Sequence, residues 1–137
     1  GLNEVIQDGT NYDGLTFQFI IGYAFAPIAF LMGVQSDDIV LVGQLLGEKT
    51  ILNEFYAYVT LGEMKSNAEF ASEKSIIMAS YILCGFSNVA SIGIQIGGIG
   101  SLVPGRKSLL SSLGFYALIG GTIACLFTAT IVGMFYS

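Results

Sequence analysis

Long apolar stretches fill most of the chain, and short polar stretches divide them. Residues 1–14 are polar, contain Gly9 and Gly14 in addition to Gly1, and are expected to form a loop. Residues 15–33 are apolar and aromatic, but Pro27 removes one backbone hydrogen bond within them. We therefore expect a helix over 15–33 that lies in the membrane interface, or is kinked, rather than a straight membrane span.

Residues 36–63 contain two short apolar arms around a polar centre. Ser36-Asp37-Asp38 provides an N-cap signal for the first arm, because the side chain of Ser36 or Asp37 can accept hydrogen bonds from the first amides of a helix. The polar residues 47–50 interrupt the pattern, and apolar positions resume over 51–61. This pattern predicts a re-entrant helical hairpin with its tip at 47–50, which enters and leaves the membrane on the same side.

The stretch 70–103 is long for a single span, and its character changes along its length. Its first half has a helical pattern, its second half is rich in glycine, and the polar residues 87–91 lie between the halves. A continuous helix whose small residues pack closely against neighbours is one interpretation. A discontinuous transmembrane helix, broken near Asn88 and facing a substrate, is the other. The pattern alone leaves both interpretations open.

The last apolar stretch, 108–135, follows a basic turn at 104–107 and is uncharged. It exceeds the roughly 20 residues that a helix needs to cross a bilayer. The sequence therefore predicts two membrane-spanning elements, one within 70–103 and one at 108–135.

Composition supports a membrane protein. Of the 137 residues, 53% are hydrophobic and only 11% are charged, whereas globular domains carry about 25% charged residues. The mean hydropathy is +0.72. The charges are also segregated, because residues 75–137 hold only Arg106 and Lys107. Together, pattern and composition predict an all-α membrane protein.

Several functional classes are excluded by residue content. A net charge of −5 argues against a nucleic-acid partner, because no basic stripe can neutralise phosphates. Histidine is absent, and Cys84 and Cys125 lie in apolar stretches, so no zinc site, catalytic residue pair or enzyme is expected. Both cysteines are expected to be small buried residues without a disulfide bond. The start at Gly1, directly before a polar loop, is expected for a fragment of a longer protein.

The candidate functional residues are polar groups whose placement in apolar surroundings costs free energy. Glu54, beside Asn53, interrupts an apolar and aromatic run, and a carboxylate at membrane depth costs roughly 2.5–3.5 kcal/mol. Asn88, Ser91 and Gln95 have the spacing of one helix face. An uncharged ligand with several hydroxyl groups would suit this set. A carboxylate accepts hydrogen bonds from hydroxyl groups, whereas amide and hydroxyl groups both donate and accept hydrogen bonds. The alternative is that these groups only pair helices with one another.

Short motifs follow one another in order over essentially the whole chain. They are Leu15-Thr-Phe-Gln18, Gly22-Tyr-x-Phe-x-Pro27, Leu31-Met-Gly33, Lys49-Thr-Ile-Leu-Asn-Glu-Phe-x-Ala-Tyr58, Cys84-Gly-Phe-Ser-Asn88, Ser91-Ile-Gly-Ile-Gln-Ile-Gly-Gly98, Pro104-Gly-Arg-Lys107 and Ala117-Leu-Ile-Gly-Gly-Thr-Ile-Ala124. In this order the chain resembles the C-terminal half of the concentrative nucleoside transporter family. A match in order over the whole chain is more specific than any single motif.

The resemblance implies a secondary active symporter that moves nucleosides into the cell by alternating access, coupled to sodium or to protons. It implies that this chain is the second of two inverted repeats. The implied elements are an interfacial helix, a re-entrant hairpin with Glu54 by its tip, a discontinuous transmembrane helix and a final transmembrane helix. The implied partners are a nucleoside, the lipid bilayer, the N-terminal half of the transporter and further copies in a homotrimer. The implied location is the plasma membrane, as a multi-pass protein. The coupling ion would be bound mainly by the N-terminal half, and no other cofactor is expected.

The resemblance also assigns roles to single residues. Glu54, Asn88 and Ser91 would hold the ribose hydroxyls, and Phe86 would lie beside the nucleobase. Asn53, next to Glu54, is expected at the same site. No metal ligand within the chain is implied.

Two rival functions remain at this stage. One is a structural or assembly subunit of the membrane whose polar residues only pair helices. The other is a channel lined by Glu54. Tyr56 and Ser87 stand where members of the family often carry a small aliphatic residue and alanine. The choice between purines and pyrimidines, and between sodium and protons, is left open.

Overall fold

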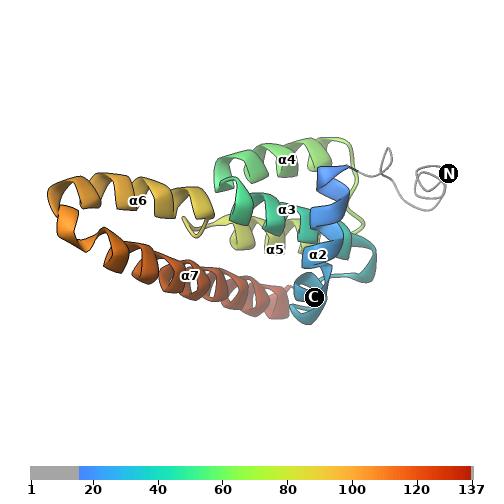
Figure 1. Ribbon diagram of the computed structural model, residues 1–137. Coiled ribbons are helices and arrows are strands. Elements are labelled where there is room, and N and C mark those ends of the chain that lie inside the picture. The colour runs from blue at the N-terminus through green and yellow to red at the C-terminus, as the bar shows by residue number, and fades with distance from the viewer. Residues whose placement is uncertain (1–15, 137) are drawn as a thin grey trace.

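The computed structural model describes residues 16–136, and all secondary structure in that range is helical (Figure 1). The expected all-α fold class is therefore confirmed, and the loop expected at 1–14 lies outside the described residues. In chain order the helices are α2 (Phe17–Leu31), η1 (Ser36–Asp38), α3 (Ile39–Ile51), α4 (Glu54–Ser66), α5 (Glu73–Leu83), α6 (Val89–Leu102), η2 (Pro104–Arg106) and α7 (Lys107–Phe135).

The helices form two regions joined by the long helix α7. Helices α2 to α5 gather at one end, whereas α6 and the first half of α7 extend away from them as a pair (Figure 1). The second half of α7 packs along α5. The largest fully buried apolar side chains come from α3 and α5, namely Leu45, Leu46, Met78, Ile82 and Leu83. Helices α3 and α5 therefore form the centre of the packed region.

Helix α2 occupies the stretch in which a single helix was expected. The hydroxyl of Thr16 accepts a hydrogen bond from the amide of Phe19 at 3.2 Å and caps the helix start. The helix ends before Gly33, whose φ of +81° is a conformation that favours glycine. Pro27 lies inside α2 without ending it. A location in the membrane interface stays a prediction.

Helices α3 and α4 form the two arms of the expected hairpin. Its tip is not at 47–50, as the pattern predicted, but beside Glu54, as the resemblance implied. Helix α3 continues to Ile51, so the turn lies at Leu52 and Asn53 rather than at 47–50. The polar side chains in 47–50 did not end the helix because they find partners inside the protein. Glu48 accepts a hydrogen bond from the side chain of Gln44, one turn earlier, at 2.8 Å. Lys49 donates to the backbone carbonyl of Ile82.

The expected N-cap at Ser36 and Asp37 was also wrong. Ser36–Asp38 forms a short 3-10 helix, and no side chain there bonds the first amides of α3. Instead, the fully buried carboxylate of Asp38 accepts from the backbone amides of Ala71 and Ser72, at 2.8 and 3.1 Å. Asp38 thus serves the N-terminal end of α5, a helix distant in sequence.

The stretch 70–103 is divided, so the interpretation as a continuous helix was wrong. Helix α5 ends at Leu83, α6 begins at Val89, and residues 84–88 between them are the helix break. The two helices contain 11 and 14 residues. They are therefore about 16 and 21 Å long, and neither alone covers the roughly 30 Å hydrocarbon core of a bilayer.

Helix α7 agrees with the predicted final helix at 108–135. Together with the turn before it, it forms a 32-residue segment, Pro104–Phe135, in which an 18-residue stretch has a mean hydropathy of 2.0. Among residues 16–136 this is the one helix that is long and apolar enough to cross a membrane by itself. Of the two expected spans, only α7 is therefore a single uninterrupted helix.

Candidate functional site

The carboxylate of Glu54 and the amide of Asn88 meet although they lie 34 residues apart. Asn88 donates from Nδ2 to Oε2 of Glu54 at 2.8 Å. Glu54 is the first residue of α4, directly after the hairpin turn, and Asn88 is the last residue of the helix break. The structure therefore brings the hairpin turn and the helix break together through these two side chains.

Ser91 belongs to the same hydrogen-bonded group. Oδ1 of Asn88 accepts from both the backbone amide and the hydroxyl of Ser91, each at 2.8 Å. The first amides of a helix lack partners within the helix, so an asparagine at this position stabilises the start of α6. Asn88 is 2% exposed and Ser91 is 7% exposed. The break is thus held in one defined conformation, with Asn88 bonded on both sides.

The group retains hydrogen-bonding capacity for a ligand. Oε1 of the half-buried Glu54 has no partner among the described residues and can accept. The hydroxyl oxygen of Ser91 can accept, and the second Nδ2 hydrogen of Asn88 can be donated. Two acceptors and one donor fit neighbouring hydroxyl groups, since each hydroxyl can both donate and accept.

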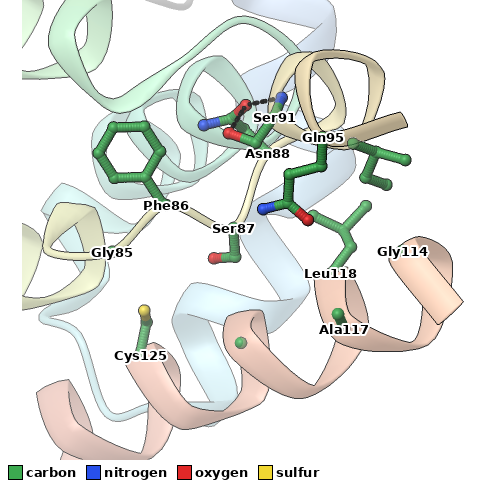
Figure 2. A pocket seen from close by; sticks show the side chains of 12 residues that line it. Gly85, Phe86, Ser87, Asn88, Ser91, Gln95, Gly114, Ala117, Leu118 and Cys125 are labelled. Carbon is green, nitrogen blue, oxygen red and sulfur yellow. Dashed lines mark hydrogen bonds between the residues drawn. The ribbon is translucent and has the colours of Figure 1, made fainter. Parts of the chain in front are cut away.

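A cavity of about 290 Å³ opens beside this group, between the helix break, α6 and α7 (Figure 2). Asn88, Ser91 and Gln95 all line it, so the prediction that they share one helix face is confirmed. The ring of Phe86 projects from the break and is 77% exposed. The remaining lining residues are Gly85, Ser87, Ile92, Gly114, Ala117, Leu118, Gly121 and Cys125.

Asn53 has a different position from the other candidates. Its Oδ1 accepts from the backbone amide of Tyr56 at 2.8 Å, so the side chain caps the start of α4. Asn53 is exposed and, like Glu54, does not line the cavity, but unlike Glu54 it has no bond to the residues that do. The structure therefore gives Asn53 a helix-capping role next to Glu54.

The two cysteines lie at the same break and are not buried as expected. Cys84 is exposed, Cys125 is partly exposed, and neither forms a disulfide bond. The thiol of Cys125 on α7 donates to the carbonyl of Cys84 at a sulfur–oxygen distance of 3.2 Å. Position 84 is exposed because the backbone leaves the helix there.

Sequence reasoning missed one buried charge near the site. Lys49 is fully buried, and its ammonium donates to the carbonyl of Ile82 in the last turn of α5 at 2.8 Å. The pattern had placed Lys49 at a polar hairpin tip. The cost of an ionisable group in an apolar run, which singled out Glu54, applies equally to Lys49 and would have identified it.

The residues 16–136 contain no group of three or more His, Cys, Asp or Glu side chains placed to hold a metal ion. Binding of a coupling ion mainly by the N-terminal half stays a prediction. The candidate site within these residues consists of uncharged polar groups and one carboxylate, that of Glu54.

Comparison with known proteins identifies the family. A family model described as "Na+ dependent nucleoside transporter C-terminus" matches residues 1–133. The chain is 47% identical to Solute carrier family 28 member 3 of Eptatretus stoutii over 138 residues, which cover 92% of this chain and 20% of that protein. It is 43% identical to the uncharacterized transporter YutK of Bacillus subtilis over 122 residues, covering 89% of this chain and 30% of the relative.

Solved structures agree with the sequence relatives. The transporter CNTnw in an inward-facing substrate-bound state superimposes with a TM-score of 0.83 at 32% identity, over 97% of this chain and 32% of that one. The chain thus spans between a fifth and a third of the length of these proteins. It belongs to the nucleoside transporter family whose C-terminal part the matching model describes, the concentrative nucleoside transporters.

Proposed function

We propose that this chain is the C-terminal half of a cation-coupled symporter that moves nucleosides into the cell. The observation that carries the proposal is that the bonded group of Glu54, Asn88 and Ser91 retains two acceptors and one donor beside a cavity of about 290 Å³. The expected multi-pass location in the plasma membrane is confirmed by the family. The named relatives are transporters, which supports the expectation that the chain is not an enzyme.

The ribose of a nucleoside is the part that this group would bind. One ribose hydroxyl would donate to Oε1 of Glu54 and accept from the Nδ2 group of Asn88. The neighbouring hydroxyl would donate to the hydroxyl oxygen of Ser91. A polar group left unpaired in a desolvated site costs roughly 1–3 kcal/mol. This penalty would select a ligand with two adjacent hydroxyls over one that lacks them.

The base would contact Phe86 at the edge of the same site. Its ring is largely exposed in this chain and could stack on the flat face of a nucleobase, since aromatic pairs gain about 0.5–1.5 kcal/mol beyond area burial. Stacking tolerates every base, so a choice between purines and pyrimidines would depend on the N-terminal half.

Alternating access would use the two irregular elements. In carriers built from inverted repeats, substrate sites lie near the middle of the membrane at discontinuous helices, and one repeat moves against the other. The break between α5 and α6 and the turn between α3 and α4 are such points in this chain. Sodium coupling, binding of the ion by the N-terminal half, and assembly as a homotrimer are part of the proposal.

A structural or assembly subunit is the second candidate function. The bond between Glu54 and Asn88 favours it as well, because such a bond can simply hold two helices together. The two functions differ in what the loss of the Glu54 charge does to transport.

The test is Glu54→Gln in a complete carrier, measured as sodium-dependent uptake of radiolabelled uridine, with surface expression measured by biotinylation. Hydrogen bonds to charged groups contribute about 1.5–3 kcal/mol. Uptake at subsaturating uridine is therefore expected to fall about 10- to 100-fold at unchanged surface expression. Glu69→Gln is the matched control, because Glu69 also accepts from an asparagine side chain (that of Asn67, at 3.1 Å) but is exposed outside the site.

A second measurement identifies the group that Glu54 binds. Uridine and 2′,3′-dideoxyuridine are compared as competitors of radiolabelled uridine uptake. The carrier is expected to prefer uridine, and Glu54→Gln is expected to reduce that preference. Unchanged uptake and unchanged preference in Glu54→Gln would contradict the proposal and favour the structural subunit.

A further inference from the structure

The C-terminal end of α5 is bonded by side chains from other helices. The last four carbonyls of a helix have no partner within it, and here the helix stops at the break that carries Asn88. Lys49 of α3 donates to the carbonyl of Ile82 at 2.8 Å. Tyr58 of α4 donates from its hydroxyl to the carbonyl of Ser80 at 2.9 Å, a carbonyl that also accepts from the backbone amide of the capping residue Cys84 at 3.2 Å. Both arms of the hairpin therefore bond the same end of α5.

Lys49 is the more unusual of the two donors. It is 0% exposed, and none of the described carboxylates forms an ion pair with it. An isolated charge is costly to bury, so its position needs a specific compensation. The C-terminal end of a helix carries partial negative charge, and the carbonyl of Ile82 lies in that last turn. Lys49 is thus placed where α5 itself stabilises an ammonium group.

The opposite end of α5 is bonded by the same segment of the chain. The carboxylate of Asp38, just before α3, accepts from the amides of Ala71 and Ser72 at the start of α5. The bonds from Asp38 to Ala71 and from Lys49 to Ile82 join residues that are each 33 positions apart. Helices α3 and α5 therefore run side by side in the same direction and in a fixed register. The negative group lies at the N-terminal end of α5 and the positive group at its C-terminal end, as the helix dipole requires.

This register determines where the site residues lie. Glu54 follows Lys49 by less than two helical turns along the chain, and Asn88 follows Ile82 by a similar number of residues. Fixing Lys49 on Ile82 brings the hairpin turn next to the helix break. The bond between Asn88 and Glu54 then forms at 2.8 Å.

We propose that Lys49 and Tyr58 are positioning residues of the nucleoside site, which clamp the hairpin to the end of α5 and so hold Glu54 against Asn88. This inference rests on the proposed function, since it assigns the clamp a role in binding the ribose. Neither side chain lines the cavity beside the site. Both act through Glu54 and Asn88 rather than by contact with the substrate.

The variants Lys49→Met and Tyr58→Phe test the clamp in a complete carrier. Methionine keeps an unbranched chain of similar length and removes the ammonium, and phenylalanine keeps the ring and removes only the hydroxyl. Hydrogen bonds from charged donors contribute more than neutral ones. The half-saturating uridine concentration is therefore expected to rise about 10-fold or more in Lys49→Met and about 3- to 5-fold in Tyr58→Phe. Lys65→Met is the control, because Lys65 is an exposed lysine on the same hairpin.

The deciding measurement is the preference for uridine over 2′,3′-dideoxyuridine, determined by competition against radiolabelled uridine uptake. A displaced Glu54 or Asn88 weakens the contacts to ribose hydroxyls, which only uridine makes. The preference is therefore expected to fall in Lys49→Met and Tyr58→Phe, to recover in part in Lys49→Arg, and to stay unchanged in Lys65→Met. A purely structural role would lower the number of carriers at the surface without changing this preference.

The outcomes separate this inference from the proposed function. If Glu54→Gln reduces the preference but Tyr58→Phe and surface-expressed Lys49→Met do not, the clamp is wrong and the nucleoside site stands. If Lys49→Met does not reach the surface, Tyr58→Phe decides, because it leaves the packing of the ring intact. If Glu54→Gln leaves both the uptake and the preference unchanged, the proposed function itself is wrong.

Discussion

A methyl group at position 43 is expected to push α2 away from α3. Gly43 lies where the backbone of α3 approaches that of α2 closely. A Cβ atom there would lie 2.5 Å from the carbonyl oxygen of Gly22, and 2.9 and 3.2 Å from the backbone nitrogen and Cα of Ala26. All three atoms belong to the backbone of α2, so no side-chain rotation can relieve the contact. The helix as a whole must shift in Gly43→Ala.

Two effects of opposite sign decide the magnitude. Alanine is favoured over glycine inside a helix by about 0.8–1.0 kcal/mol. Forcing an extra carbon into a packed contact costs about 1–3 kcal/mol, and the upper part of that range applies because backbone atoms are involved. Gly43→Ala is therefore expected to lower the free energy of unfolding by about 1–2 kcal/mol in net terms.

Gly62→Ala is the matched control for this prediction. Gly62 lies inside α4, and a Cβ atom built there meets no atom within 4 Å among the described residues. Only the helix propensity changes, so this variant is expected to be more stable than the parent. The assay is the thermal unfolding midpoint of the purified complete carrier in detergent. A midpoint for Gly43→Ala at or above the parent, with Gly62→Ala also raised, would refute the backbone contact between α2 and α3.

Two further predictions concern the ends of α5. Gly85 in the helix break has a φ of +152°, and a Cβ atom there would lie 2.7 Å from the sulfur of Cys125, so Gly85→Ala is expected to cost about 1–3 kcal/mol. Uridine uptake per carrier at the surface should fall with it, and normal uptake would contradict a fixed break. Asp38→Asn keeps the shape but loses the charge that accepts two backbone amides, which is expected to cost about 1.5–3 kcal/mol. It should lower the unfolding midpoint without changing the preference for uridine over 2′,3′-dideoxyuridine, and a changed preference would contradict a purely structural role for Asp38.

The hydrophobic pattern was sufficient for features that depend on local sequence. It predicted α7, because an uncharged run of that length has few alternatives to a helix. It also predicted that Asn88, Ser91 and Gln95 share a face, because helical spacing alone determines which residues lie together. The family followed from motifs in order over the whole chain, which requires no knowledge of contacts.

Other features depended on partners that lie far away in the sequence. The hairpin tip was placed too early because 47–50 is polar, and the sequence does not reveal that Lys49 reaches the carbonyl of Ile82. Asp38 was taken as part of a local cap, although its partners lie at the start of α5. In both cases a charged side chain was given a role in its local segment, whereas a helix terminus distant in sequence compensates its burial.

The candidate site combines both kinds of information. The sequence by itself identified Glu54 as a costly carboxylate and Asn88 as a polar group at a possible break. Only the tertiary structure decided that the break exists and that the two side chains meet at 2.8 Å. The cost of a charge in apolar surroundings can be judged from its neighbours along the chain. The partner that offsets this cost is determined by how the hairpin packs on α5, because that packing brings residues 34 positions apart into contact.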